Sequence, residues 1–135
     1  LQAAILNHKF KNFDKVIERR RNIAEIYQSQ LALLDEIQLP PPPSKTSDNF
    51  DVYQNYEIMA DKRDELKNFL SERNIGTLIQ WGGKGIHHFR ELGFNQQLPN
   101  TDMFFEKCIM LPMNIFISDD DVEYICENIK TFYRK

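Results

Sequence analysis

A helical repeat of apolar residues near the N-terminus constrains the fold of this chain more than any other feature. Apolar side chains recur at steps of three and four residues from Leu6 to Leu34, with an interruption at Arg20. This spacing places them on one stripe of an amphipathic helix. The stripe runs for about nine turns, which is longer than the usual globular helix. The sequence therefore predicts one long N-terminal helix.

The first residues contain no helix start signal. Helices normally begin after Ser, Thr, Asp or Asn, because the first amide groups need an acceptor, and Leu1 offers none. We therefore expect the helical pattern to begin upstream in a longer protein; a processing or expression boundary at a frayed helix end is the alternative. The stripe formed by Leu6, Phe10 and Phe13 would be exposed, which is typical of an interface.

Four consecutive prolines end the helical region. Pro40–Pro43 can neither continue a helix nor pair within a sheet. We predict a short edge strand at Ile37–Leu39 before them and a surface loop at Ser44–Asn49 after them. A proline run can also bind an SH3-type domain, an interpretation that we favour less because basic residues are missing on one side.

The rest of the chain alternates strand and helix patterns. Residues 52–59, 77–81 and 108–111 are predicted strands, being rich in β-branched, aromatic and other apolar residues. Three further helices are predicted from their N-cap residues, which are Asp61, Thr101 and Ser118. Gly76 is predicted to be the C-cap of the first of these helices. The predicted fold class is α+β, a small, mainly antiparallel sheet packed by helices, with the long helix at the N-terminus.

Length and charge exclude several classes of protein. The chain has 135 residues and a formal charge of −3, which suits one globular domain and argues against a nucleic-acid binder. No apolar run approaches the ~18 residues of a membrane span. Cys108 and Cys126 fall in apolar patterns and are predicted to be core residues. Two cysteines are too few for a disulfide framework, so we expect a cytoplasmic protein.

A glycine-rich loop is the most unusual local feature. Residues 82–85 read Gly-Gly-Lys-Gly, where glycines allow close backbone approach and a lysine can hold an anion. The spacing is not that of a Walker loop, and a plain turn after a strand is the favoured alternative. His87 could donate to a substrate oxygen or be a surface histidine. Adjacent His87 and His88 do not share a helical face, so we expect no zinc site.

Two charged clusters have ordinary structural explanations. The acidic run 119–121 is predicted to stabilise a helix start, and the arginines at 19–21 to form a solvated face or a partner contact. Nothing among the residues assembles a nucleophile, a base and an oxyanion site, so the residues alone predict a binding or assembly domain.

Seven short motifs follow one another along the chain: Leu1–Leu6; Phe13–Asp14 with Arg19–Ala24 and Tyr27; Val52–Tyr56; Arg63–Leu66 with Asn74–Thr77; Leu98–Thr101; Met110–Met113; and Ile117–Val122. In this order they resemble the DegT/DnrJ/EryC1/StrS family of pyridoxal-phosphate sugar aminotransferases, over residues 1–133. The resemblance implies that residues 1–135 are the C-terminal small domain of such an enzyme, with an absent N-terminal large domain that binds pyridoxal 5′-phosphate through a Schiff-base lysine. The isolated chain would then be inactive.

The resemblance also implies where substrate binds. The segment from Trp81 to Phe94 is similar to the substrate loop of the branch that aminates nucleotide-linked 3-keto-6-deoxyhexoses. His87 matches the loop histidine, Trp81 replaces the aromatic residue at the strand end, and the family's prolines are missing. The implied substrate-binding residues are Trp81, Gly82, Gly83, Lys84 and His87, with no catalytic, cofactor-binding or metal residue in this chain.

The implied enzyme moves an amino group from an amino acid, with glutamate expected, to a nucleotide-linked keto-deoxy sugar in polysaccharide or sugar biosynthesis, and a homodimer is expected. The alternative is a non-enzymatic ligand-binding or oligomerisation module, which predicts an ordinary capped first helix. A nucleic-acid module ranks last, because it needs a basic face and exposed sheet aromatics, whereas Tyr53 and Tyr56 would lie on opposite strand faces.

Overall fold

A small antiparallel sheet lies at the centre of the molecule. The computed structural model describes residues 1–44 and 50–134. The three strands are β1 (Ile37–Gln38), β2 (Tyr56–Ala60) and β3 (Cys108–Leu111), in the order β1-β2-β3. The five α-helices of the described residues are α1 (Gln2–Phe10), α2 (Phe13–Leu31), α3 (Arg63–Ser71), α4 (Pro99–Lys107) and α5 (Asp119–Tyr133). The predicted α+β class and the antiparallel sheet are confirmed.

The sheet is smaller than predicted. Ile58 faces Ile109 across the β2–β3 pair, and alternate residues of β2 are buried. The strand predicted at 52–59 begins only at Tyr56, because Tyr53 has a left-handed φ of +47° that extended backbone does not allow. The strand predicted at 77–81 is reduced to a single bridge between Leu78 and Met110.

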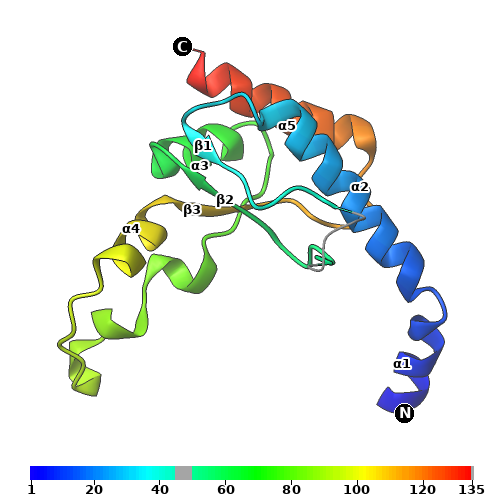
Figure 1. The fold of residues 1–135 in the computed structure, drawn as a ribbon, viewed down its shortest axis with the longest axis horizontal. Helices are drawn as coiled ribbons and strands as arrows, with labels where there is room; N and C mark the ends of the chain where they lie inside the picture. Colours follow the sequence, from blue (N-terminus) through cyan, green and yellow to red (C-terminus); the bar gives the residue numbers. More distant parts are fainter. Residues whose placement is uncertain (45–49, 135) are drawn as a thin grey trace.

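Helices α2 and α5 lie side by side and supply most of the helical part of the core (Figure 1). Their buried apolar residues are Ile23, Ala24, Tyr27, Leu31, Val122, Ile125, Cys126 and Ile129. The ring of Tyr27 packs against that of Tyr56 in the central strand, with centroids 4.8 Å apart and ring planes tilted by 33°, so α2 is fixed to the sheet by aromatic packing. Cys108 and Cys126 are both free and buried, as predicted.

The predicted single N-terminal helix is wrong, because the chain breaks it between α1 and α2. Asn12 has φ −115° and ψ +14°, and its amide donates to the Lys9 carbonyl as in a tighter turn. Helix α1 has no buried residue, whereas helical stability in proteins comes mainly from tertiary packing. The apolar repeat is therefore continuous in sequence, but only its second part is packed. Leu6, Phe10 and Phe13 are exposed, as predicted.

Two of the three arginines in the cluster of α2, Arg19 and Arg21, are structural rather than part of a solvated face. Arg21 is buried and donates to the backbone carbonyls of Asp51 at 2.7 Å and Ser44 at 2.8 Å. Arg19 forms an ion pair with Asp119 and donates to the Ile117 carbonyl. These arginines tie α2 to segments distant in the sequence, a role that the local sequence pattern does not reveal.

One predicted helix cap is confirmed and three are wrong. Ser118 accepts from the Asp121 amide while the Asp121 carboxylate accepts from Ser118, which forms a capping box at α5. Helix α3 begins after Lys62 rather than Asp61, and Thr101 lies inside α4. Asn74, with φ +59°, occupies the left-handed position predicted for Gly76, because asparagine also tolerates that conformation.

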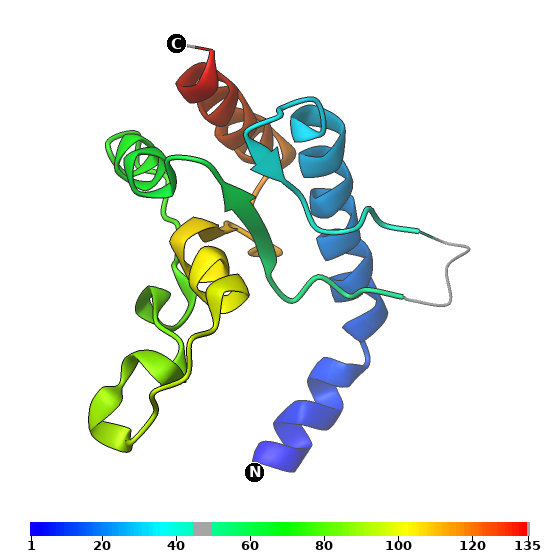
Figure 2. The same ribbon diagram turned by 60° about the vertical axis from the view of Figure 1, so that its left-hand side comes forward.

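Two parts of the molecule project away from this core on the same side, namely α1 and the segment that we call the distal arm, residues 80–98 (Figures 1 and 2). The arm contains short 3-10 turns at Gln80–Gly83, Ile86–His88 and Arg90–Leu92, and it leads into α4. Residues 45–49 of the predicted loop lie outside the described residues. None of the described helices has the length and apolar character needed to cross a membrane.

Candidate functional site

The glycine-rich loop forms the start of the distal arm and has an unusual backbone. Trp81, Gly82 and Gly83 follow one another with φ values of +53°, +65° and +74°. Glycine adopts this left-handed region freely, but a bulky residue such as tryptophan rarely does. The turn directs the Trp81 side chain outward, where it is 77% exposed. Strain of this kind is concentrated at ligand-binding and active sites.

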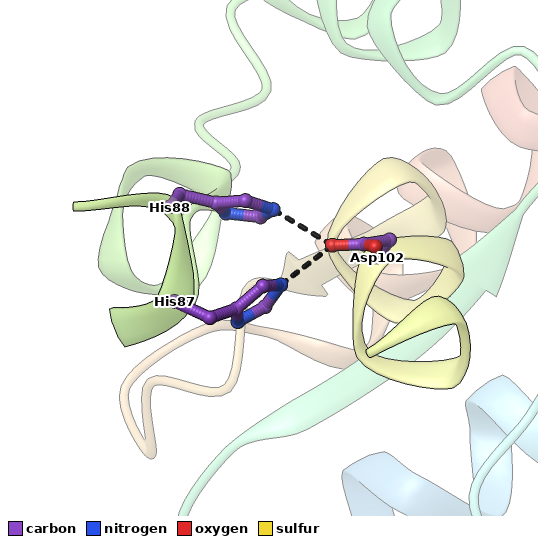
Figure 3. Close-up of side chains that lie close together, drawn as sticks. All are labelled: His87, His88 and Asp102. Atoms are coloured by element: carbon purple, nitrogen blue, oxygen red, sulfur yellow. Dashed lines mark hydrogen bonds and ion pairs between the residues drawn. The ribbon is translucent and has the colours of Figure 1, made fainter. Parts of the chain in front are cut away.

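Two histidines and one aspartate meet at the base of the arm. His87 and His88 lie on the Ile86–His88 turn, and Asp102 lies on α4 (Figure 3). The Nε2 atoms of both histidines are 2.7 Å from the same oxygen, Oδ1 of Asp102. Adjacent residues can converge in this way because they lie on a tight turn rather than on the α-helix that the sequence argument assumed.

The hydrogen bonds of His88 determine its tautomer. The Gly85 amide donates to Nδ1 of His88 at 3.0 Å, so this nitrogen carries no hydrogen. Neutral His88 therefore carries its hydrogen on Nε2 and donates it to Asp102. The hydrogen bonds from His87 and then His88 lower the pKa of the Asp102 carboxyl, which is consequently an ionised acceptor at neutral pH.

The same three residues form a group whose ligand-type atoms lie within 4.8 Å of one another. A metal bound to Nε2 of His88 would require the hydrogen on Nδ1. That hydrogen would point at the Gly85 amide, which already donates to Nδ1. The geometry therefore favours a hydrogen-bonded network over a metal site.

Gly85 is required for the position of His87. A Cβ atom built on Gly85 would lie 2.7 Å from Cε1 and 2.8 Å from Nδ1 of His87, closer than real Cβ contacts. The φ of Gly85 is −82°, which any residue adopts. Glycine is therefore required here because it has no side chain, and not because of its backbone conformation. His87 is buried, and it is not the surface histidine that the sequence left as one possibility.

Two pockets flank the histidine pair. An apolar pocket of about 620 Å³ is lined by Trp81, Lys84, Gly85, Ile86, His87, Phe89, Leu92, Leu98, Thr101 and Phe105. A more polar one of about 400 Å³ includes His87, His88, Arg90 and Asp102. The structure thus brings Trp81, Lys84 and His87 of the predicted site to one pocket. Gly82 and Gly83 shape the turn and do not line it.

Asp102 and His88 are the site residues that the sequence argument missed. Asp102 is far from the histidines in sequence, and only the fold of the arm back onto α4 brings it within reach. Asp102 directly follows Leu98–Thr101, a segment that resembles a family motif. This position beside the motif was the sequence signal that could have identified Asp102 as a site residue. The buried thiols do not add a nucleophile, since burial raises the pKa of Cys108 and raises that of Cys126 to about 12.

The chain resembles curated proteins along nearly its whole length. A "Pleiotropic regulatory protein" of Geobacillus stearothermophilus is 34% identical over 99% of this chain and 37% of its own length. The "dTDP-3-amino-3,6-dideoxy-alpha-D-galactopyranose transaminase" of Aneurinibacillus thermoaerophilus is 27% identical over 98% of this chain and 36% of its own length. The chain therefore spans about a third of the length of these relatives.

The fold is similar to that of solved aminotransferases. The structure of S. venezuelae DesV in complex with a ketimine intermediate superposes with a TM-score of 0.89 at 25% identity, over 99% of this chain and 36% of that one. A DegT DnrJ EryC1 StrS aminotransferase from Brucella abortus gives a TM-score of 0.85 at 27% identity, over 99% of this chain and 35% of that one. A family model described as "DegT/DnrJ/EryC1/StrS aminotransferase family" matches residues 1–130. The chain belongs to the DegT/DnrJ/EryC1/StrS aminotransferase family.

Proposed function

We propose that residues 1–135 form the C-terminal small domain of a pyridoxal-phosphate-dependent aminotransferase. The enzyme transfers an amino group, with glutamate as the expected donor, to a nucleotide-linked keto-deoxy sugar. The observation that carries this proposal is the family match over residues 1–130 together with named sugar transaminases among the relatives. A GDP-perosamine synthase of Vibrio cholerae, 30% identical over 98% of this chain, adds to that support.

The cofactor does not fit the candidate site of this chain. Pyridoxal phosphate needs a lysine for the Schiff base and a carboxylate for its pyridine nitrogen. Lys84 is the one lysine among the residues that line the apolar pocket, and no carboxylate lines it. We propose that residues outside this chain, in an N-terminal domain of the same enzyme, bind the cofactor and supply its carbanion chemistry.

The distal arm would contribute part of the substrate wall. The proposed substrate-binding residues are Trp81, Gly82, Gly83, Lys84 and His87. The exposed indole of Trp81 offers a flat apolar surface, and Lys84 on the same pocket offers a positive charge. These two groups suit the base and the phosphates of a nucleotide-linked sugar, since aromatic faces stack on bases and ammonium groups bind phosphate.

We propose two macromolecular contacts for the intact enzyme. Leu6, Phe10 and Phe13 are exposed, and the rings of Phe10 and Phe13 stack at 5.5 Å, an apolar grouping that is typical of an interface. The N-terminal domain of the same enzyme is the expected partner at this surface, and the enzyme is expected to be a homodimer. The cytoplasmic location stays a prediction of the sequence.

A second candidate function is a non-enzymatic ligand-binding or oligomerisation module. The specific observation in its favour is the 34% identical relative named as a regulatory protein. Such a module would bind a nucleotide sugar through the same arm without turning it over. The enzyme and a ligand-binding module therefore predict the same ligand and differ in the product, whereas an oligomerisation module predicts no such ligand.

The test is an assay of the full-length protein that contains residues 1–135. It is incubated with pyridoxal phosphate, glutamate and either dTDP- or GDP-linked keto-deoxy sugars, and products are identified by mass spectrometry. We expect an amino sugar nucleotide and an equal amount of 2-oxoglutarate. Binding of the nucleotide sugar without amino transfer would support the ligand-binding module instead. A result with neither binding nor turnover would contradict both the enzyme and the ligand-binding module.

A further inference from the structure

The ring nitrogens of the histidine pair are not equally available to a ligand. His88 uses both of its nitrogens inside the chain, with Nδ1 accepting from Gly85 and Nε2 donating to Asp102. His87 uses only Nε2, which contacts the same Asp102 oxygen. Among the described residues, nothing hydrogen-bonds to Nδ1 of His87. Of the four ring nitrogens in the pair, this one remains for a ligand.

The chemistry of Asp102 decides what this nitrogen can do. An ionised carboxylate only accepts hydrogen bonds, so Nε2 of His87 must carry a hydrogen to contact it at 2.7 Å. A neutral imidazole has one hydrogen, and Nδ1 of His87 is therefore an acceptor. This reverses the role of hydrogen-bond donor to a substrate oxygen that the sequence suggested for His87.

The packing around Gly85 keeps the Nδ1 edge of His87 in place. Because Gly85 has no side chain, the His87 ring can pack closely against it, with Cε1 and Nδ1 at 2.7 and 2.8 Å from the position that a Cβ atom of Gly85 would occupy. Gly85 lines the apolar pocket and Asp102 lines only the polar one. The ring thus turns its Nε2 edge to Asp102 and its Nδ1 edge towards Gly85 and the apolar pocket.

We propose that Asp102 is a positioning residue that holds His87 in the Nε2–H tautomer, so that Nδ1 accepts a hydrogen bond from a hydroxyl group of the sugar ligand. The proposal rests on the function proposed above. A sugar hydroxyl, which can donate a hydrogen bond, is thereby assigned as the partner of Nδ1 of His87. The phosphate and keto oxygens are excluded as partners because they cannot donate. Asp102 itself does not contact the ligand.

The first test needs no substitution at Asp102. The full-length protein is labelled with ¹⁵N-histidine and its imidazole nitrogens are observed by NMR at about pH 8.5, where an ordinary imidazole is neutral. His87→Gln and His88→Gln variants identify the signals. We expect hydrogen on Nε2 and none on Nδ1 for both residues. A hydrogen on Nδ1 of His87 would overturn the proposal.

The second test uses two substitutions with matched controls. Asp102→Asn replaces the carboxylate by a weaker acceptor that can also donate, and we expect His87 to populate the Nδ1–H form. Gly85→Ala places a Cβ against the His87 ring edge without backbone strain. In the active enzyme each should raise the KM for the nucleotide sugar about tenfold, the effect of one lost hydrogen bond, with kcat within about twofold.

The controls separate positioning from general destabilisation. Asp61→Asn removes another carboxylate bonded to a side chain of α4, Lys107, at 2.7 Å, and should leave KM unchanged. Gly76→Ala adds a Cβ with nothing within 4 Å and should also be neutral. Asp102→Glu retains the carboxylate and should keep the Nε2–H form of His87.

The outcomes distinguish this proposal from the function on which it rests. If the wild-type protein shows no amino transfer, the proposed function fails, while the imidazole spectrum still reports the tautomer. If the enzyme is active and Asp102→Asn changes neither the tautomer nor KM, the positioning role fails and the function stands. A changed tautomer with an unchanged KM would also contradict the role assigned to Nδ1.

Discussion

The core and the distal arm of this molecule are stabilised by different kinds of interaction. In the core, α2, α5 and the sheet enclose side chains with no exposed surface, such as Ile23, Tyr27 and Ile129. In the arm, the larger apolar side chains are largely exposed, and Leu92 is an example at 65%. Among the described residues, the arm is attached to α4 by the hydrogen bonds of His87 and His88 to Asp102 and by contacts around Phe105.

The difference indicates that the two regions have different requirements. The core needs no partner to bury its apolar side chains, because its own helices and strands cover them. The arm presents apolar side chains and a strained turn to its surroundings, which is the usual character of a binding segment on a rigid scaffold. Stability should therefore depend on the core and ligand binding on the arm, and four predictions examine this division.

The largest effect is expected from a truncation in the core. Ile129→Ala removes a fully buried side chain of α5 and should lower the free energy of unfolding by about 2–5 kcal/mol. Leu92→Ala, its counterpart in the arm, should change that energy by no more than about 0.5 kcal/mol. Urea denaturation followed by circular dichroism measures both. Equal losses at the two sites would abolish the distinction between the regions.

A smaller effect is expected where a buried charge joins distant segments. Arg21→Met keeps the bulk of the side chain but removes its hydrogen bonds to the Asp51 and Ser44 carbonyls, and should cost about 1.5–3 kcal/mol. The matched control is Arg134→Met, which changes an exposed arginine after α5. If Arg21→Met leaves the free energy of unfolding unchanged, the structural role of Arg21 would be wrong and the solvated face suggested by the sequence would be favoured again.

The helix cap at the edge of the core should contribute less. Ser118→Ala removes the side-chain oxygen that accepts from the Asp121 amide, and we expect a loss of about 1 kcal/mol. Ser71→Ala, at the exposed end of α3, serves as the control because that serine lies at no helix start. Thermal unfolding of both variants measures the difference, and identical midpoints would show that the capping box is dispensable.

The smallest effect belongs to the acid dependence of the arm. Hydrogen bonds from His87 and His88 lower the folded-state pKa of Asp102 below its ordinary value of about 3.9. Its contribution to stability is therefore present above the unfolded pKa and is lost as the pH falls through the folded one. Asp102→Asn should make the acid limb of the unfolding curve shallower. Asp35→Asn, which removes an exposed carboxylate that lies outside the helices, should alter the limb less.

The sequence predicted the core better than the arm, for a physical reason. Repeats such as Val122, Ile125 and Ile129 reflect burial directly, and Ser118 acts on its own helix, so both could be inferred locally. The break at Asn12 was missed because the repeat continues through it, although α1 has nothing to pack against. The left-handed conformation after α3 was predicted for Gly76 but is adopted by Asn74. The sequence could not distinguish the two positions, because glycine and asparagine both tolerate this conformation.

The site could be located from the sequence but not assembled. The residues from Trp81 to His87 were identified as a loop of interest, and Trp81, Lys84 and His87 do share a pocket. The network with Asp102 depends on a chain reversal over residues 88–98 that contains no regular element longer than a turn. Hydrogen-bond partners brought together by such a reversal leave no periodic signal, and the tautomer of His87 follows only from them.

The position of Trp81 also gives the molecule an optical reporter. It is the chain's one tryptophan, and it lies on the exposed turn, whereas Tyr27, Tyr53 and Tyr56 are buried together in the core. Indole emission responds strongly to the polarity of its surroundings and can be excited at wavelengths that tyrosine does not absorb. Within residues 1–135, fluorescence at the red edge of excitation therefore follows the arm alone, and near-ultraviolet circular dichroism of the tyrosines follows mainly the core.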